Sequence, residues 1–143
     1  MAEVLEGEEL RAFLLAGTRT AKVAVTRKDG SPAVAPIWFV MDGDDLLFTT
    51  MNTSLKYKAM KRDPRISLCV DEEEFPYAFA VIRGRAEIEE LSEEELLPWS
   101  TQIAARYVPA DRVEEYGRRN ADPNEVLVRV RPEQVFAYTG IAD

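Results

Sequence analysis

The segment TAKVAVTRKDGSPAVAPIWFVMDGDDLLFTT, residues 20–50, decides the fold class of this chain. It opens with alternating apolar and polar residues that place Ala21, Val23 and Val25 on one face, as in a half-buried β-strand. KDGS and DGDD are typical of hairpin turns, and the apolar runs after them, PAVAPIWFVM and LLFTT, predict two more strands. Pro36 indicates a sheet edge or a bulge, because proline cannot donate a hydrogen bond to the ladder. Strands joined by such short turns predict an antiparallel sheet.

The rest of the sequence adds helices and strands around this segment. Amphipathic or capped patterns predict helices over residues 7–17, 52–63, 92–108 and 110–120. Strands are predicted over residues 65–71 and 77–90, with two more over residues 125–140, one on each side of Pro132. Because helices do not alternate with strands, the pattern favours an antiparallel barrel over a βαβ sheet. We therefore expect one domain over residues 1–143, of mainly β (α+β) class, with six or seven strands and flanking helices.

The composition limits the chemistry that this protein can perform. Its 143 residues include 18 Lys+Arg, 26 Asp+Glu and no His, which gives a net charge of −8. The absence of histidine excludes Ser–His and Cys–His nucleophilic pairs and imidazole metal ligands. Only one cysteine, Cys69, is present, so no metal site is expected. An enzyme of this composition would draw its chemistry from a bound organic cofactor.

The same composition bears on partners and location. An acidic chain is unsuited to general nucleic-acid binding, which needs a broad basic surface. No apolar run approaches the roughly 20 residues that cross a membrane, and the opening MAEVLEGEEL is acidic, unlike a signal peptide. The unpaired Cys69, in a strand predicted to be buried, fits a reducing compartment. We expect a cytoplasmic protein without nucleic-acid or membrane partners.

Against this acidic background, the segment TTMNTSLKYKAMKRDPRISL, residues 49–68, concentrates positive charge. Its basic residues are Lys56, Lys58, Lys61, Arg62 and Arg65. The NTS triplet at residues 52–54 favours the start of a helix. A helix start offers unpaired N–H groups and the positive end of the helix dipole, and the hydroxyls of Thr49, Thr50 and Ser54 add donors. This corner is therefore a candidate anion site.

Lys56 occupies a notable position on the predicted helix. At about 100° per residue it shares one arc with the apolar Leu55, Ala59 and Met60, while most of the other basic side chains lie on the opposite side. A lysine on the core-facing side of a helix needs an anionic partner or a path to water. The two interpretations are an anion site and a solvated basic face on which Lys56 extends its ammonium group to water.

The order of the motifs resembles one known superfamily. VTRKDGSPAVAPIWFVMDGDDLLFTTMNTSLKYKAMKRDPRISLCVDEE, then PYAFAVIRGRAEI, then EVLVRVRPEQVFAY are similar to the pyridoxamine 5'-phosphate oxidase-like split-barrel flavin-binding superfamily. Within it, the chain looks most like the flavin/deazaflavin oxidoreductase branch that uses coenzyme F420. The resemblance spans about residues 7–140 and implies a split β-barrel that works as a homodimer with two cofactor sites at its interface. Pyridoxamine-phosphate oxidase itself uses additional Arg and His residues for its substrate, so vitamin B6 oxidation is not expected here.

The resemblance also implies where the anionic parts of the cofactor bind. The cofactor phosphate would lie at the corner formed by Thr49, Thr50 and Lys56, with Ser54 close by. Lys28 and the basic helix would attract the glutamyl tail of a deazaflavin coenzyme. The concentration of positive charge in an acidic protein would then serve to hold an anionic cofactor.

For the ring of the cofactor, the resemblance implies a different set of contacts. The ring would lie along the second strand, held mainly by backbone groups of Pro36, Ile37 and Trp38. Tyr77 and Phe79 would wall the site from the partner chain of the homodimer.

The function favoured by these inferences is hydride transfer from reduced F420 to a small conjugated organic substrate. FMN bound to the same fold, as an oxidoreductase or a flavin carrier, is the first alternative, because both cofactors present a phosphate to the same corner. The second alternative is a non-catalytic module whose basic helix binds RNA or an acidic protein. No catalytic residue is assigned: Tyr57, Tyr77, Tyr107 and Tyr138 are candidate proton donors, with no partner pattern that selects one.

Overall fold

The computed structural model describes all 143 residues and contains eight strands and four α-helices. The strands are β1 (Glu3–Val4), β2 (Ala21–Thr26), β3 (Pro32–Ile37), β4 (Val40–Asp42), β5 (Asp45–Met51), β6 (Arg65–Glu72), β7 (Ala78–Glu89) and β8 (Glu125–Thr139). The helices are α1 (Gly7–Leu15), α2 (Leu55–Arg62), α3 (Glu93–Tyr107) and α4 (Val113–Arg119), with a 3-10 turn, η1 (Ala110–Arg112), before α4. Every strand pair is antiparallel, which confirms the mainly β class.

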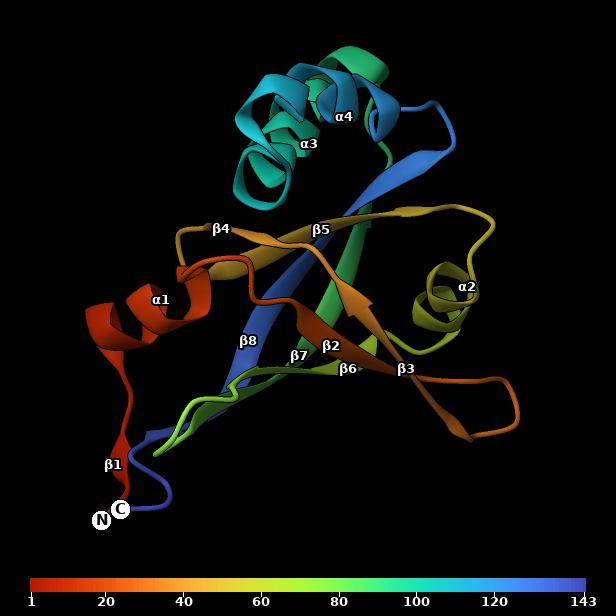
Figure 1. Ribbon diagram of the computed structural model, residues 1–143. Coiled ribbons are helices and arrows are strands. Elements are labelled where there is room, and N and C mark those ends of the chain that lie inside the picture. Colours follow the sequence, from red (N-terminus) through yellow and green to blue (C-terminus); the bar gives the residue numbers. More distant parts are fainter.

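The strands form one strongly curled sheet. Their order is β3-β2-β6-β7-β8-β5-β4, and the short β1 pairs with the end of β8. The edge strands β3 and β4 are separated in sequence only by Trp38 and Phe39, so a two-residue crossover joins the two edges of the sheet (Figure 1). No ladder pairs β3 with β4, and the barrel is therefore not closed by hydrogen bonds.

The structure changes two predicted strands and confirms one edge. PAVAPIWFVM is not one strand, because it divides into β3 and β4 at Trp38, and the short β1 was not predicted. The prediction that Pro36 marks an edge is confirmed, because β3 pairs only with β2. The predicted break at Pro132 is wrong, since β8 runs through it as one 15-residue strand.

A bulge between β7 and β8 accommodates Pro132 without ending the strand. Gly84 pairs with Pro132 at the point where the register of the two strands shifts. A Cβ atom on Gly84 would lie 2.2 Å from the carbonyl oxygen of Arg131, far inside van der Waals contact. Only glycine therefore allows the two strands to approach this closely.

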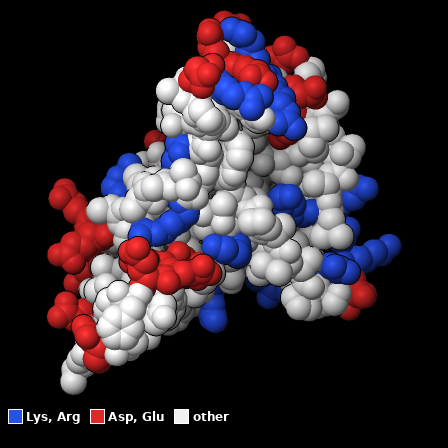
Figure 2. Space-filling model, in the orientation of Figure 1, with Lys and Arg blue, Asp and Glu red and all other residues white.

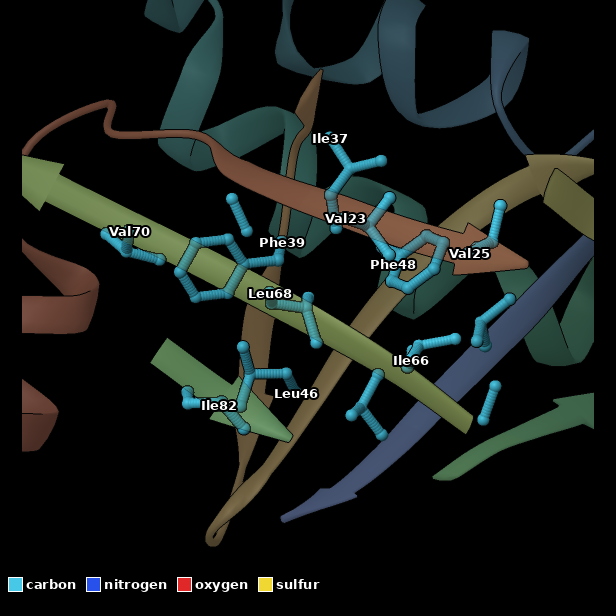
Figure 3. Packing of buried hydrophobic residues seen from close by; sticks show 14 of the residues in the cluster. Val23, Val25, Ile37, Phe39, Leu46, Phe48, Ile66, Leu68, Val70 and Ile82 are labelled. Atoms are coloured by element: carbon cyan, nitrogen blue, oxygen red, sulfur yellow. The ribbon is translucent and has the colours of Figure 1, made fainter. Parts of the chain in front are cut away.

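Two hydrophobic clusters flank β5. The main cluster of 21 buried residues fills the curled sheet, where the alternating Val23 and Val25 point inward beside Phe39 and Phe48 (Figure 3). The second cluster lies between the outer face of the sheet and the helical lobe, the name we use for α3, η1 and α4. Its members are Val40, Leu47, Leu96, Ile103, Ala121 and Leu127. Leu46 and Phe48 of β5 point into the main cluster, whereas Leu47 between them points into the second cluster, so β5 packs on both of its faces.

The strand β6 is buried on one face only. Ile66, Leu68 and Val70 are buried, whereas Cys69 is half-buried on the opposite face, so the expected burial of this strand holds for one face and not for Cys69. None of the four helices combines the length and hydrophobicity that a membrane crossing requires.

Candidate functional site

The crossover between β3 and β4 presents an aromatic ring beside a cavity. Its two residues point in opposite directions: Phe39 is fully buried in the main core, whereas Trp38 is 36% exposed. The Trp38 ring stacks on Tyr107 of α3, with 5.2 Å between ring centroids and 5° between ring planes. Tyr116 of α4 lies on a tilted plane 6.5 Å away. The indole is therefore held in one orientation between the sheet and the helical lobe.

Arg106, in the last turn of α3, fixes the backbone of the crossover. Its guanidinium group donates hydrogen bonds to the carbonyl oxygens of Phe39 at 2.8 Å, Leu14 at 2.8 Å and Gly17 at 3.0 Å. The same group lies over the Phe39 ring, 4.5 Å from its centroid. One side chain thus joins the crossover, the end of α1 and the segment after α1 to the helical lobe.

Tyr107 supports the same crossover with its hydroxyl group. The oxygen accepts a hydrogen bond from the Phe39 N–H at 3.2 Å, and the O–H donates to the carbonyl oxygen of Arg19 at 2.8 Å. Burial raises the pKa of Tyr107, so the phenol stays neutral. Because its proton is committed to a backbone carbonyl, Tyr107 serves the structure and is a poor candidate for the proton donor.

The predicted helix start after β5 forms with a side-chain cap. The Ser54 hydroxyl accepts a hydrogen bond from the N–H of Tyr57 at 3.1 Å, which confirms the capping prediction. The same hydroxyl is 2.8 Å from that of Thr50, which is buried. The hydroxyl groups of Thr50 and Ser54 are therefore engaged in hydrogen bonds at the start of α2. Thr49 lies on the other face of β5 and is half-buried.

A cavity of about 280 Å³ opens between β3, β5, the first turn of α2 and the helical lobe. Its lining residues are Pro36, Ile37, Trp38, Thr49, Lys56, Ile103, Asn120 and Glu125. Five of these eight residues were predicted from the sequence as cofactor contacts. We call this cavity the Lys56 cavity. A neighbouring, more apolar cavity of about 230 Å³ lies between β2, β3 and α2, and Lys56 lines both.

Lys56 is the one basic residue of α2 that lies at these cavities. It is half-buried, and no hydrogen bond or ion pair within the chain engages its ammonium group. Lys58, Lys61 and Arg62 are exposed on the other side of the helix, as predicted. Arg65 is paired with Asp63 at 2.7 Å. The structure therefore divides the basic segment into a solvated face and a single inward-lying cation without an internal partner.

The charged surface around α2 is limited in extent. Figure 2 shows the Lys and Arg atoms on the side of α2 and the β2–β3 turn as separate groups among uncharged atoms, with a small acidic group beside them at the lower right. No group of three or more His, Cys, Asp or Glu side chains is placed to bind a metal ion.

Five of the ten predicted contacts do not line the Lys56 cavity: Thr50 and Ser54, described above, and Lys28, Tyr77 and Phe79. Lys28 is exposed in the β2–β3 turn. Tyr77 and Phe79 lie around the start of β7, near the chain termini and far from α2 in Figure 1. Phe79 packs against Tyr138 with 5.9 Å between ring centroids. Their contact with a cofactor bound to a partner chain stays a prediction.

Sequence reasoning missed Glu125, which lies at the cavity where β8 begins. Its Oε2 atom is buried without a hydrogen-bond partner. Burial raises the pKa of Glu125, and Asp122 raises it further, whereas the charge of Lys56 opposes both effects. The sequence signal was an acidic residue at the head of the apolar strand EVLVRV.

The arrangement suits an anionic cofactor with an apolar ring. Lys56 supplies an uncommitted cation, Thr49 supplies a hydroxyl group, and the segment from Pro36 to Trp38 supplies a rigid wall. Ligand sites typically combine such an apolar wall with a few polar groups. The residues present therefore fit a flavin-type cofactor, bound through its phosphate.

Comparisons with known proteins agree with this fold. The family described as Pyridoxamine 5'-phosphate oxidase matches residues 7–139. No curated protein shows significant similarity to the sequence. A conserved hypothetical protein, Rv2991 from Mycobacterium tuberculosis, superposes with a TM-score of 0.83 at 24% identity, covering 96% of this chain and 86% of its own.

Two similar structures are of proteins named for flavin-type cofactors. An F420 reductase is 26% identical, with a TM-score of 0.66, and the match covers 87% of this chain and 94% of the reductase. A FAD-binding protein from Mesorhizobium loti is also 26% identical, with a TM-score of 0.68, and the match covers 96% of each chain.

Proposed function

This chain belongs to the pyridoxamine 5'-phosphate oxidase family, and from that premise we propose that it is an F420-dependent oxidoreductase. It would transfer a hydride from the reduced deazaflavin to a small conjugated organic substrate. The observation that carries the proposal is the uncommitted ammonium group of Lys56 in a cavity walled by Trp38. Similarity to an F420 reductase over most of both chains supports this choice of cofactor.

Five residues of the Lys56 cavity have a defined part in this proposal. Lys56 and the Thr49 hydroxyl hold the phosphate through charge-assisted and neutral hydrogen bonds. Pro36, Ile37 and Trp38 form the wall for the ring. The position of this wall is restricted, because Arg106 and Tyr107 hold the backbone of Phe39 by hydrogen bonds. When bound, the cofactor supplies the hydride chemistry, and the protein supplies orientation and a partly dry surface.

FMN or another flavin is the second candidate for the cofactor. Similarity to a FAD-binding protein at the same identity favours it. The phosphate contacts would be the same, because Lys56 and Thr49 recognise the anion and not the ring. A flavin-bound protein would act as an oxidoreductase or as a flavin carrier.

The proposal includes a homodimer. Phe79 and Val81 of β7 lie opposite Tyr138 and Phe136 of β8 in the ladder, so the four side chains share the outer face of the sheet. Phe136 is 41% exposed and Tyr138 is 36% exposed. A second copy of the chain would cover this apolar face, as homodimer interfaces commonly do. Sedimentation velocity is expected to show twice the mass of one chain, and a monomer at micromolar concentration would contradict the dimer.

Titration of the purified protein with F420 and, separately, with FMN tests the proposed function. Fluorescence of each cofactor is followed as the protein is added. Binding of F420 that is at least tenfold tighter than that of FMN supports the proposal. The reverse order supports the flavin candidate, and failure of both cofactors to bind overturns the oxidoreductase assignment.

A further inference from the structure

Glu125 places a second charged group in the cavity where the phosphate is proposed to bind. It is the first residue of β8 and pairs with Met51 at the end of β5, one turn of chain before α2 begins. Its backbone N–H donates to the carbonyl oxygen of Asp122 at 2.8 Å, which fixes the main chain at this point. The backbone of Glu125 is therefore fixed beside the cavity that its side chain lines.

The charges that face Glu125 come from two elements. Lys56 lies on α2, and Asp122 lies in the turn that precedes β8. The other elements at the cavity contribute uncharged groups: Thr49 from β5, Asn120 from the end of α4 and the β3 segment with Trp38. No ion pair joins Glu125 to Lys56, although both line one cavity.

An ionised Glu125 opposes the binding of an anion in this cavity. Two negative charges that share one partly desolvated site repel each other, and such a site favours protonation of the carboxylate. The protonated carboxyl group, in contrast, carries an O–H that can donate to a phosphate oxygen. The buried Oε2 atom has no hydrogen-bond partner in the chain, so protonation of the carboxylate there breaks no existing hydrogen bond.

We propose that Glu125 makes binding at the Lys56 cavity proton-linked: when the phosphate of the cofactor binds beside Lys56, one proton from the solvent transfers to the Glu125 carboxylate. This inference rests on the proposed function and adds a regulating residue to it. The bound anion stabilises the neutral carboxyl group, and by linkage the neutral carboxyl group stabilises the bound anion. Affinity for the cofactor therefore falls as pH rises from the pKa of Glu125 in the free protein to its higher pKa in the complex.

The raised pKa of Glu125 agrees in sign with this linkage. Burial already disfavours the charged carboxylate before any ligand binds. A phosphate brought next to it shifts the balance further in the same direction. The free protein loses the proton at a lower pH than the complex, so the complex holds more protons at any pH between the two pKa values.

Replacement of Glu125 by glutamine tests the linkage. The wild-type protein, Glu125→Gln and the control Glu90→Gln are titrated with F420 and with FMN at pH 6, 7 and 8 in phosphate-free buffers. Glu90 is an exposed residue whose carboxylate lies 3.5 Å from the Tyr57 hydroxyl of α2, so the control removes a negative charge near the same helix but outside the cavity. Titration of the ligand's own phosphate is common to all three proteins and cancels in their ratios.

The expected result is a pH-dependent difference between wild type and Glu125→Gln. From pH 6 to pH 8 the ratio of the wild-type Kd to the Glu125→Gln Kd should grow by up to about 100-fold, because uptake of one proton per ligand bound changes the ratio about tenfold per pH unit. Glu90→Gln should follow the wild type. Calorimetry of the wild type in two buffers of different ionisation enthalpy should show proton uptake on binding, a readout that needs no variant.

Each outcome supports the linkage or overturns it. Binding with the same pH dependence in wild type and Glu125→Gln, or calorimetry without proton uptake, overturns this inference alone and leaves the proposed function standing. Failure of both cofactors to bind the wild type at every pH overturns the proposed function and this inference together.

Discussion

Replacement of Arg106 by methionine should destabilise the crossover between β3 and β4, which positions Trp38. The guanidinium group donates hydrogen bonds to four backbone carbonyls, those of Phe39, Leu14, Gly17 and Arg19. Methionine keeps much of the apolar length of the side chain but removes every donor. The carbonyl oxygens then lose charge-assisted hydrogen bonds at a site that water reaches only in part.

The magnitude follows from the number of bonds lost. Each hydrogen bond contributes about 1 kcal/mol net, the middle of the usual range, which is appropriate for a group that is not fully buried. Loss of four bonds lowers the free energy of unfolding by about 4 kcal/mol. For a domain of this size, that corresponds to a fall in Tm on the order of 10 °C. The stacked Trp38–Tyr107 pair should also loosen, which would reduce the near-UV circular dichroism signal.

Urea unfolding at one protein concentration measures the effect, with Arg118→Met as the matched control. Arg118 makes a single exposed ion pair with Glu114, so its replacement should change the free energy of unfolding by less than about 0.5 kcal/mol. Arg106→Lys keeps the positive charge but not the planar fork, and it should lie between the wild type and Arg106→Met. If Arg106→Met unfolds at the same urea concentration as Arg118→Met, the argument that Arg106 fixes the crossover is wrong.

Two further substitutions test the packing of the strands and the start of α3. Gly84→Ala should lower the free energy of unfolding by about 2 kcal/mol or more, because its Cβ would meet the carbonyl oxygen of Arg131 at 2.2 Å, and unchanged stability in calorimetry would show that the bulge relaxes freely. Ser92→Ala removes a capping box in which Ser92 and Glu95 bond reciprocally to backbone N–H groups, and should cost about 1 kcal/mol in chemical denaturation, whereas a neutral result would mean that water replaces the cap.

Local patterns predicted the strands that have one buried face. The alternation of Val23 and Val25 in β2 follows directly from the period of a strand, and both residues lie in the core. Pro36 revealed an edge, because the missing N–H is a local property. The division at Trp38 was not predictable in the same way. Both residues of the crossover are aromatic, so the pattern could not show that one enters the core and the other faces α3.

The break expected at Pro132 illustrates a long-range compensation. Proline normally interrupts a ladder, and the sequence around it offers no local sign that β8 continues. The compensating residue is Gly84, which lies 48 positions earlier and becomes its neighbour only when β7 and β8 pair. Such pairs are set by register, which a single strand does not reveal.

The candidate site shows the same division between local and long-range information. Helical periodicity placed Lys56 on the inner arc of α2, and the structure puts it at the cavity. The hydroxyl groups of Thr50 and Ser54 were expected beside a phosphate, but they bond to each other, an arrangement that depends on the turn between strand and helix. Glu125 reaches the cavity only through the pairing of β5 with β8, so its place could not be deduced from its own segment.

The most direct test of the account is the affinity of Lys56→Ala for the cofactor, compared with Lys58→Ala. Both variants remove one lysine from α2, but only Lys56 lines the cavity, whereas Lys58 lies on the exposed face. Loss of a charge-assisted hydrogen bond of about 1.5–3 kcal/mol should weaken binding of the cofactor by about 10- to 100-fold in Lys56→Ala. Lys58→Ala should bind within about threefold of the wild type, as expected for a solvated charge. Equal affinity of the two variants would contradict the placement of the phosphate at Lys56, and with it the proposed site.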